Sequence, residues 1–255
     1  MGGDGFKMSR FFVNSSNISG DSIIISGEDV NHIKRVLRLG IGDIITVTDG
    51  SGIDYRVEIA KLNESAIETR IIESVKNLTE PPVEIVLYQG LPKSDKMEYV
   101  IQKGVELGLR GIVPVITERT VVKLDSKKDE QKKCERWNRI SMEAAKQSNR
   151  GIIPHVELPI DFKKAVIAAK DYDISLIPYE KEKSNGLKNI IFNKNFTKRI
   201  SIFIGPEGGF TEKEVEMAVE NGIHPVTLGP RILRTETAGI AVLSILMYEL
   251  GDVGK

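Results

Sequence analysis

The chain has 255 residues, with 36 Lys and Arg against 36 Asp and Glu, three His and one Cys. This length suits one or two globular domains; the single Cys excludes a disulfide framework or a multi-cysteine metal site, and no apolar run nears the roughly 20 residues of a membrane span. Because the chain opens with no signal peptide, we expect a cytoplasmic protein, and the zero net charge by itself argues against a nucleic-acid partner.

The first 75 residues carry short β-type patterns. Met1–Lys7 is Gly-rich and has no periodicity, so it adds nothing to the fold prediction, and Met8 is a second candidate start. One short helix is predicted at Gly27–Leu39, ended by Gly40, and Asp49–Gly52 has the composition of a hairpin turn. Short strands with tight turns and no βαβ spacing indicate a small β-barrel of about 65 residues. The predicted strands are Ser22–Ile25, Asp43–Thr48, Ile53–Ile59 and Ser65–Ile72.

The segment Leu78–Pro82 predicts a linker, and strands alternate with helices after it. This alternation predicts a parallel α/β sheet with helices on both faces. The helix Thr211–Glu220 carries a capping box and a Gly222 stop. The other predicted helices are Lys96–Leu109, Glu130–Ser148, Asp161–Lys170 and Glu236–Leu250; the predicted strands are Val83–Tyr88, Ile112–Ile116, Ile174–Ile177, Ile200–Ile204 and Val226–Leu228.

Ligands of such sheets bind beyond the carboxyl ends of the strands, which directs attention to three loops. Gly205–Phe210 has three glycines, which permit a sharp turn and close approach of a ligand to the backbone. Its spacing matches neither common phosphate loop, and it carries Glu207 and no Lys. It therefore suits a ligand that is neutral or cationic where Glu207 reaches it, unless it is simply a Gly-rich turn. The composition of the third loop, Pro178–Glu180, is by itself only weak evidence for a ligand-binding site.

The loop Leu228–Ala238 places two arginines, Arg231 and Arg234, before the last helix. Thr235 or Glu236 can cap that helix, but capping does not explain cations where the helix already carries partial positive charge. The two arginines indicate a site for an anion, either a nucleic-acid phosphate or a charge that develops during reaction.

The charge is distributed unevenly along the chain. Residues 76–150 contain 15 basic and 11 acidic residues, and the predicted helix segment His32–Arg38 has three cations and no acid. Such a segment is either a solvated helix face or part of a surface that binds phosphates. The three His and the single Cys show no spacing typical of metal ligands, so no metal site is expected.

Taken together, the segments Ile204–Phe210 and Leu228–Ala238 resemble the two signature segments of the ribosomal RNA small subunit methyltransferase E family, which belongs to the SPOUT methyltransferases. Weaker matches are Arg10–Phe12, Asp95–Glu98 and Glu106–Gly108. The resemblance implies a PUA-like RNA-binding barrel at 8–77. It also implies a SPOUT methyltransferase domain at 83–255, with a trefoil knot at about 200–250 and a homodimer formed through this domain.

The resemblance also implies a reaction and a site. The reaction is transfer of the methyl group of S-adenosylmethionine to N3 of one uridine near the decoding site of 16S rRNA, in the assembled small ribosomal subunit. Arg234, Arg231 and Glu236 are the expected catalytic residues, with Arg234 or Arg231 stabilising negative charge and Glu236 acting as a base or orienting an arginine. The expected RNA contacts are Arg10, Lys34, Arg35, Arg38, Lys93 and Arg150. The expected cofactor contacts are Leu176, Ile177, Pro178, Ile204, Gly205, Pro206, Glu207, Gly208, Gly209, Leu228, Gly229, Ile232, Leu233, Arg234, Thr235, Thr237 and Ala238.

Two other functions remain open from the residues alone. One is an RNA-binding module with a degenerate enzyme domain, which would not bind S-adenosylmethionine. The other is a nucleotide-phosphate enzyme that uses Gly205–Gly209 as an anion site, which ATP or NAD would occupy in place of S-adenosylhomocysteine.

Overall fold

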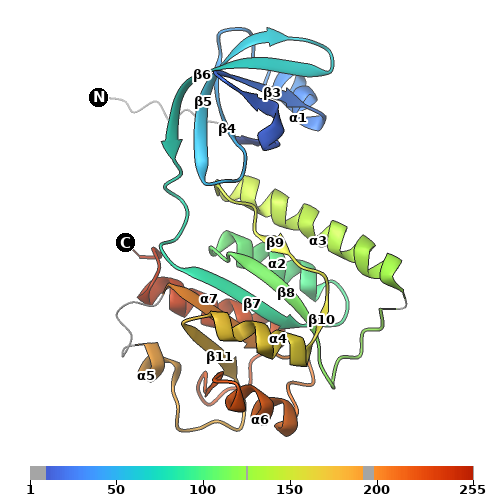
Figure 1. The fold of residues 1–255 in the computed structure, drawn as a ribbon, viewed down its shortest axis with the longest axis vertical. Helices are drawn as coiled ribbons and strands as arrows, with labels where there is room; N and C mark the ends of the chain where they lie inside the picture. The colour runs from blue at the N-terminus through green and yellow to red at the C-terminus, as the bar shows by residue number, and fades with distance from the viewer. Residues whose placement is uncertain (1–9, 125, 192–197, 255) are drawn as a thin grey trace. The chain divides into compact units, whose positions relative to one another are not determined.

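The computed structural model describes residues 10–124, 126–191 and 198–254, so Met1–Lys7 and Met8 lie outside the described residues. The chain divides into two compact units (Figure 1). The first contains the residues up to Glu80 together with Ala145–Ile153, and the second contains Pro81–Ala144 and the chain from Pro154 onward. The segment 145–153 thus packs with the first unit, although it lies inside the range expected for the second domain.

The first unit is built on a six-stranded sheet in the order β1-β4-β5-β6-β3-β2. Alternate residues face its core, as the two-residue period of a strand requires; Ile23 and Ile25 of one strand and Val57 and Ile59 of another are fully buried or nearly so. The strands are β1 (Arg10–Phe12), β2 (Ile18–Ser19), β3 (Ser22–Ser26), β4 (Ile44–Thr48), β5 (Ile53–Leu62) and β6 (Ala66–Lys76). The helical segments are η1 (Ser15–Asn17), α1 (Glu28–Asn31) and the π-helical η2 (His32–Val36).

The second unit contains a seven-stranded sheet in which the pairings are parallel, in the order β10-β8-β7-β12-β11-β13 with β9 beside β8. Its strands are β7 (Glu84–Gly90), β8 (Gly111–Ile116), β9 (His155–Val156), β10 (Ile160–Asp161), β11 (Ile174–Pro178), β12 (Arg199–Ile204) and β13 (His224–Val226). Its helices are α2 (Lys96–Glu106), α3 (Lys127–Gln147), α4 (Phe162–Ala168) with η3 (Ala169–Asp171), α5 (Leu187–Ile191), α6 (Glu212–Glu220) and α7 (Thr235–Glu249).

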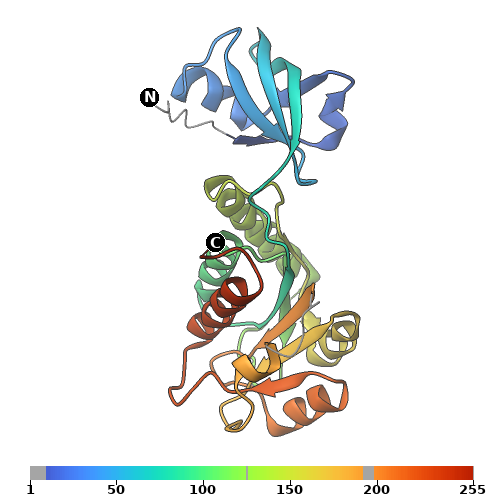
Figure 2. The same cartoon turned by 90° about the vertical axis from the view of Figure 1, so that its left-hand side faces the viewer.

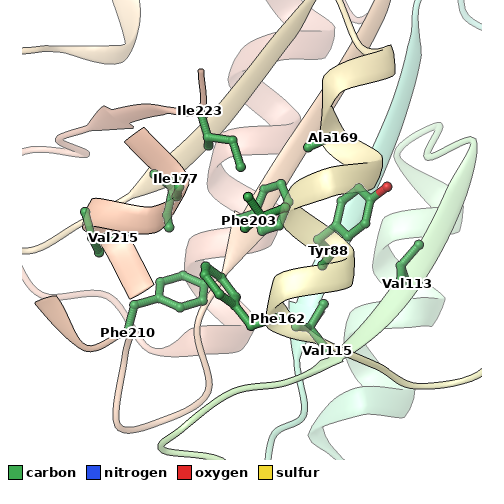
Figure 3. Packing of buried hydrophobic residues seen from close by; sticks show 13 residues of the cluster. Tyr88, Val113, Val115, Phe162, Ala169, Ile177, Phe203, Phe210, Val215 and Ile223 are labelled. Carbon is green, nitrogen blue, oxygen red and sulfur yellow. The ribbon is translucent and has the colours of Figure 1, made fainter. Parts of the chain in front are cut away.

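Helices cover both faces of this sheet, with α2 and α7 on one side and α4 on the other (Figure 2). Neighbouring strand residues therefore point into different cores. On the α4 side, Tyr88 and Phe203 stack with ring centroids 4.6 Å apart, and Phe162 meets Phe203 edge-on (Figure 3). On the other side, Leu87 and Ile202 lie with residues of α2 and α7. The predicted mixed α/β fold class is confirmed.

Local signals in the sequence set several element ends. Thr211 accepts from the Glu214 backbone N–H and completes the capping box of α6, and Gly222 after that helix has a φ of +84°. The last strand ends at Val226, two residues before the predicted end, so Leu228 belongs to the following loop.

The knot expected at about 200–250 stays a prediction. No helix in the described part of the chain combines the length and the apolar character that crossing a membrane requires.

Candidate functional site

Three loops of the second unit meet at one edge of its sheet. Because β12, β11 and β13 are neighbouring parallel strands, their carboxyl ends lie together, and the loops that follow them line a cavity of about 440 Å³. This volume is in the usual range for small-molecule sites. The residues of the cavity wall that were expected as cofactor contacts are Pro178, Ile204, Gly205, Pro206, Glu207, Gly208, Gly209, Leu228, Gly229, Ile232, Leu233, Arg234, Thr235 and Ala238.

Three expected cofactor residues are absent from this wall. Leu176 and Ile177 are fully buried within β11, because only the end of the strand, Pro178, reaches the cavity. Thr237 lies on α7 and also does not line it. Among the described residues, the wall also includes Lys96, Tyr179, Glu180, Phe210, Thr227 and Pro230, which were not predicted as cofactor contacts.

The glycine-rich loop, residues 205–210, is closely packed at Gly205 and where it contacts the end of β7. A Cβ on Gly205 would lie 3.0 Å from backbone atoms of Gly209, whose φ is +66°. A Cβ on Gly90, at the end of β7, would lie 2.5 Å from Cδ of Pro206. The backbone of β7 therefore directly supports the loop, and this packing requires glycine at positions 90 and 205.

The hydroxyl group of Thr235 joins the two signature segments. Its Oγ1 donates to the carbonyl of Gly205 at 2.6 Å and accepts from Nε2 of Gln89 at 2.9 Å. Thr235 is 6% exposed and Gln89 is fully buried. Because this short network is buried, it fixes the start of α7 against the glycine-rich loop.

Glu207 binds protein groups instead of pointing free into the cavity. Its carboxylate accepts from the backbone N–H of Lys93 at 3.1 Å and from Nζ of Lys96 at 2.9 Å. Partial burial acts to raise the Glu207 pKa, but these hydrogen bonds outweigh it and the pKa lies below its ordinary value. The hydrogen bond between Lys96 and Glu207 also raises the pKa of Lys96 above its ordinary value. The suggestion that Glu207 attracts a cationic ligand is therefore not supported, because this carboxylate anchors its loop to the start of α2.

The two arginines of the second loop line the cavity with exposed side chains. Arg234 is the N-cap residue of α7, with extended backbone and no side-chain capping bond. Within the described residues, neither Arg231 nor Arg234 takes part in an ion pair. Glu236 does not line the cavity, and its Oε2 lies 3.6 Å from Nζ of Lys96. The arrangement thus offers two cations to an anion, while the carboxylates of Glu207 and Glu236 are held by Lys96.

The expected RNA contacts fall into two groups. Arg10 is paired with Asp54 at 2.6 Å with 10% of its side chain exposed, and Arg150 is paired with Glu80 at 2.6 Å with 3% exposed. The structure does not support these two as RNA contacts, because their guanidinium groups are largely buried and paired with carboxylates of the first unit.

The remaining cations keep access to solvent. Arg35, Arg38 and Lys93 are exposed, and Lys34 is partly exposed with Nζ donating to the Asn63 carbonyl. Among the described residues, no cluster of His, Cys, Asp and Glu could hold a metal ion.

Comparison with known proteins places this chain among RNA-modifying enzymes. Residues 79–247 match the model of an RNA methyltransferase domain, and residues 25–72 match that of an RNA methyltransferase PUA domain. The ribosomal RNA small subunit methyltransferase E of Bacillus subtilis is 38% identical over 88% of this chain and 89% of its own length. The corresponding protein of Mesomycoplasma hyopneumoniae is 37% identical over 93% and 98%.

A solved structure shows the same similarity in three dimensions. It is that of a ribosomal RNA small subunit methyltransferase E from Neisseria gonorrhoeae bound to S-adenosylmethionine. It superimposes with a TM-score of 0.84 at 33% identity, and the alignment covers 96% of this chain and 99% of that one.

Proposed function

Because this chain belongs to the ribosomal RNA small subunit methyltransferase E family, we propose that it methylates N3 of one uridine of 16S rRNA, near the decoding site, with S-adenosylmethionine as methyl donor. The observation that carries this proposal is the cavity formed where the glycine-rich loop and the arginine-bearing loop meet. Its wall combines closely packed backbone, suited to a nucleoside and an amino-acid group, with two exposed arginines.

The cavity has the features that the donor requires. S-adenosylmethionine supplies a methyl group already activated on a sulfonium, so the chain mainly has to position it in line with the attacking nitrogen. The backbone of Gly205–Gly209, with Leu228, Leu233 and Ala238, would enclose the donor. The donor has no phosphate, which agrees with a glycine-rich loop that contains no Lys.

Arg234 is the residue to which we assign charge stabilisation, with Arg231 beside it. Uracil N3–H is weakly acidic, so negative charge develops on the base as its proton passes to solvent water. The new N3–methyl bond forms as the C–S bond of the donor breaks, and S-adenosylhomocysteine departs. A guanidinium placed before the reaction stabilises that charge in the transition state. Glu236 contacts Lys96 and, among the described residues, forms no ion pair with either arginine, so its position does not support the role of orienting an arginine.

The RNA is the second substrate, and we assign its further contacts to the exposed or partly exposed cations of the first unit, Lys34, Arg35 and Arg38, together with Lys93. A base within folded rRNA must leave its stack to reach a cavity of this kind. We further propose that the protein works in the cytoplasm, on the assembled small subunit. We also propose a homodimer through the second unit, which the exposed Ile245 and Tyr248 of α7 support.

The direct test is mass spectrometry of 16S rRNA from cells that lack this protein. We expect one N3-methyluridine to disappear and to return when the purified protein is added to the small subunits with S-adenosylmethionine. If the methyluridine persists, the proposal is wrong. Return of methylation on naked rRNA but not on subunits would overturn only the assignment of the assembled subunit as substrate.

A further inference from the structure

Two carboxylates of the site converge on one ammonium group. Lys96 is the first residue of α2, and its Nζ lies 2.9 Å from Oε1 of Glu207 and 3.6 Å from Oε2 of Glu236. Glu207 comes from the glycine-rich loop and Glu236 from the first turn of α7. Lys96 itself lines the cavity. The ammonium group of Lys96 therefore contacts the carboxylates of both Glu207 and Glu236, and Lys96 lines the same cavity as the two arginines.

The two carboxylates depend on Lys96 to different degrees. Glu207 also accepts from the backbone N–H of Lys93, so it keeps one partner if Lys96 is lost. Oε2 of Glu236 is buried, and among the described residues it has no hydrogen-bond partner. Since the side chain is only 18% exposed, loss of Lys96 would leave this charge poorly solvated, and it would turn toward another cation.

The nearest alternative cation along the chain is Arg234, two residues before Glu236. Arg234 is exposed at the cavity and forms no ion pair within the described residues. A carboxylate that pairs with this guanidinium would compete with any anion that it must bind. We propose that Lys96 is a positioning residue that withholds Glu236 from Arg234 and so keeps Arg234 available to the RNA substrate. This inference rests on the proposed methyltransferase function.

The experiment compares single and double variants of the full chain in methyl transfer from labelled S-adenosylmethionine to unmethylated small subunits. We expect Lys96→Met to lower kcat/KM about 100-fold, comparable to loss of a charge-stabilising donor. Addition of Glu236→Gln to it should recover at least about tenfold, because the competing charge is gone. Lys96→Arg, which keeps the cation, should retain roughly a third or more of wild-type turnover.

A matched control separates a specific contact from the overall charge of the cavity. Glu180 also lines the cavity but has no contact with Lys96 among those described, so Lys96→Met with Glu180→Gln should remain as slow as Lys96→Met alone. Equal recovery with Glu180→Gln would show a general charge effect and overturn the inference. A double variant with Glu236→Gln that is slower than Lys96→Met would also overturn it, since Glu236 would then be needed in the reaction itself.

Two further measurements keep the result interpretable. Calorimetry with S-adenosylmethionine should give dissociation constants within about threefold of wild type, which shows that the cavity is intact; a loss of binding that parallels the loss of turnover would make Lys96 a structural residue. The same series built on Lys96→Gln guards against a folding defect of one variant. Failure of the proposed function is distinguishable, because wild-type protein would then transfer no methyl group at all.

Discussion

Gly90→Ala should disturb the cavity from beneath the glycine-rich loop. Gly90 ends β7, and an added Cβ would lie 2.5 Å from Cδ and 2.7 Å from N of Pro206. Ordinary contact begins at 3.4 Å, so the strand and the loop would have to separate by about 0.9 Å. The obstructing atoms belong to a proline ring and to backbone, which cannot rotate away as the tip of a flexible side chain would.

The strain introduced by Gly90→Ala can lower either the free energy of unfolding or the affinity for S-adenosylmethionine. Overpacking of this kind costs about 1–3 kcal/mol. If the loop stays in place, the free energy of unfolding falls by that amount. If the loop shifts, the strain is relieved but the cavity changes shape, and affinity for S-adenosylmethionine falls by roughly 5- to 150-fold, since 1.4 kcal/mol corresponds to a factor of ten.

Both quantities can be measured, by denaturant unfolding and by isothermal titration calorimetry. Gly111→Ala is the matched control, because Gly111 is also a strand glycine of this sheet, but its Cβ would meet only ordinary contacts at 3.6 and 3.8 Å. The two losses in Gly90→Ala should sum to about 1–3 kcal/mol relative to this control. If Gly90→Ala matches Gly111→Ala in both measurements, the reasoning from packing is refuted.

Three other changes test the site. Arg234→Ala should lower kcat by about 10²–10³ and leave the dissociation constant for S-adenosylmethionine within a few-fold; equal losses in both assays would make it a donor ligand instead. Thr235→Val should lower the free energy of unfolding by about 1–3 kcal/mol in urea, because the Gly205 carbonyl loses its buried donor, and Thr235→Ser should not. Because the pKa of Glu207 is lowered from its ordinary 4.5, the stability advantage of wild type over Glu207→Gln should be present above about pH 4.5 and shrink at lower pH; an advantage that grows on acidification would contradict this.

The meeting of the three loops at one edge followed from the sequence, because alternating strands and helices imply a parallel sheet whose loops after the strands gather at one edge. The partners of individual side chains did not follow. Glu207 and Lys96 are 111 residues apart, and they meet because β7 lies beside β12, an adjacency that no local pattern encodes. For this reason the sequence did not reveal that Glu207 anchors its loop to Lys96.

The same limit explains the errors about basic residues. In the sequence Arg10 and Arg150 are indistinguishable from surface cations, but in the structure they are largely buried in ion pairs with Asp54 and Glu80. By contrast, signals within one turn of chain worked well, as the capping box at Thr211 shows. Strand lengths were underestimated where β5 and β6 continue past bulges near Val57 and Lys61, because a bulge interrupts the alternation by which a strand is recognised.

The pairing of Glu80 with the segment that follows α3 has a consequence for synthesis of the chain. Glu80 accepts from Arg150 and from the backbone N–H groups of Gly151 and Ile152. The first unit therefore cannot form these hydrogen bonds until about 75 more residues have been synthesised after its last strand ends at Lys76. At 5–20 residues per second this takes roughly 4–15 s. During that interval the carboxylate of Glu80 and the buried site of Arg150 stay unfilled, so the amino-terminal unit, although made first, cannot finish folding until the ribosome has released part of the second.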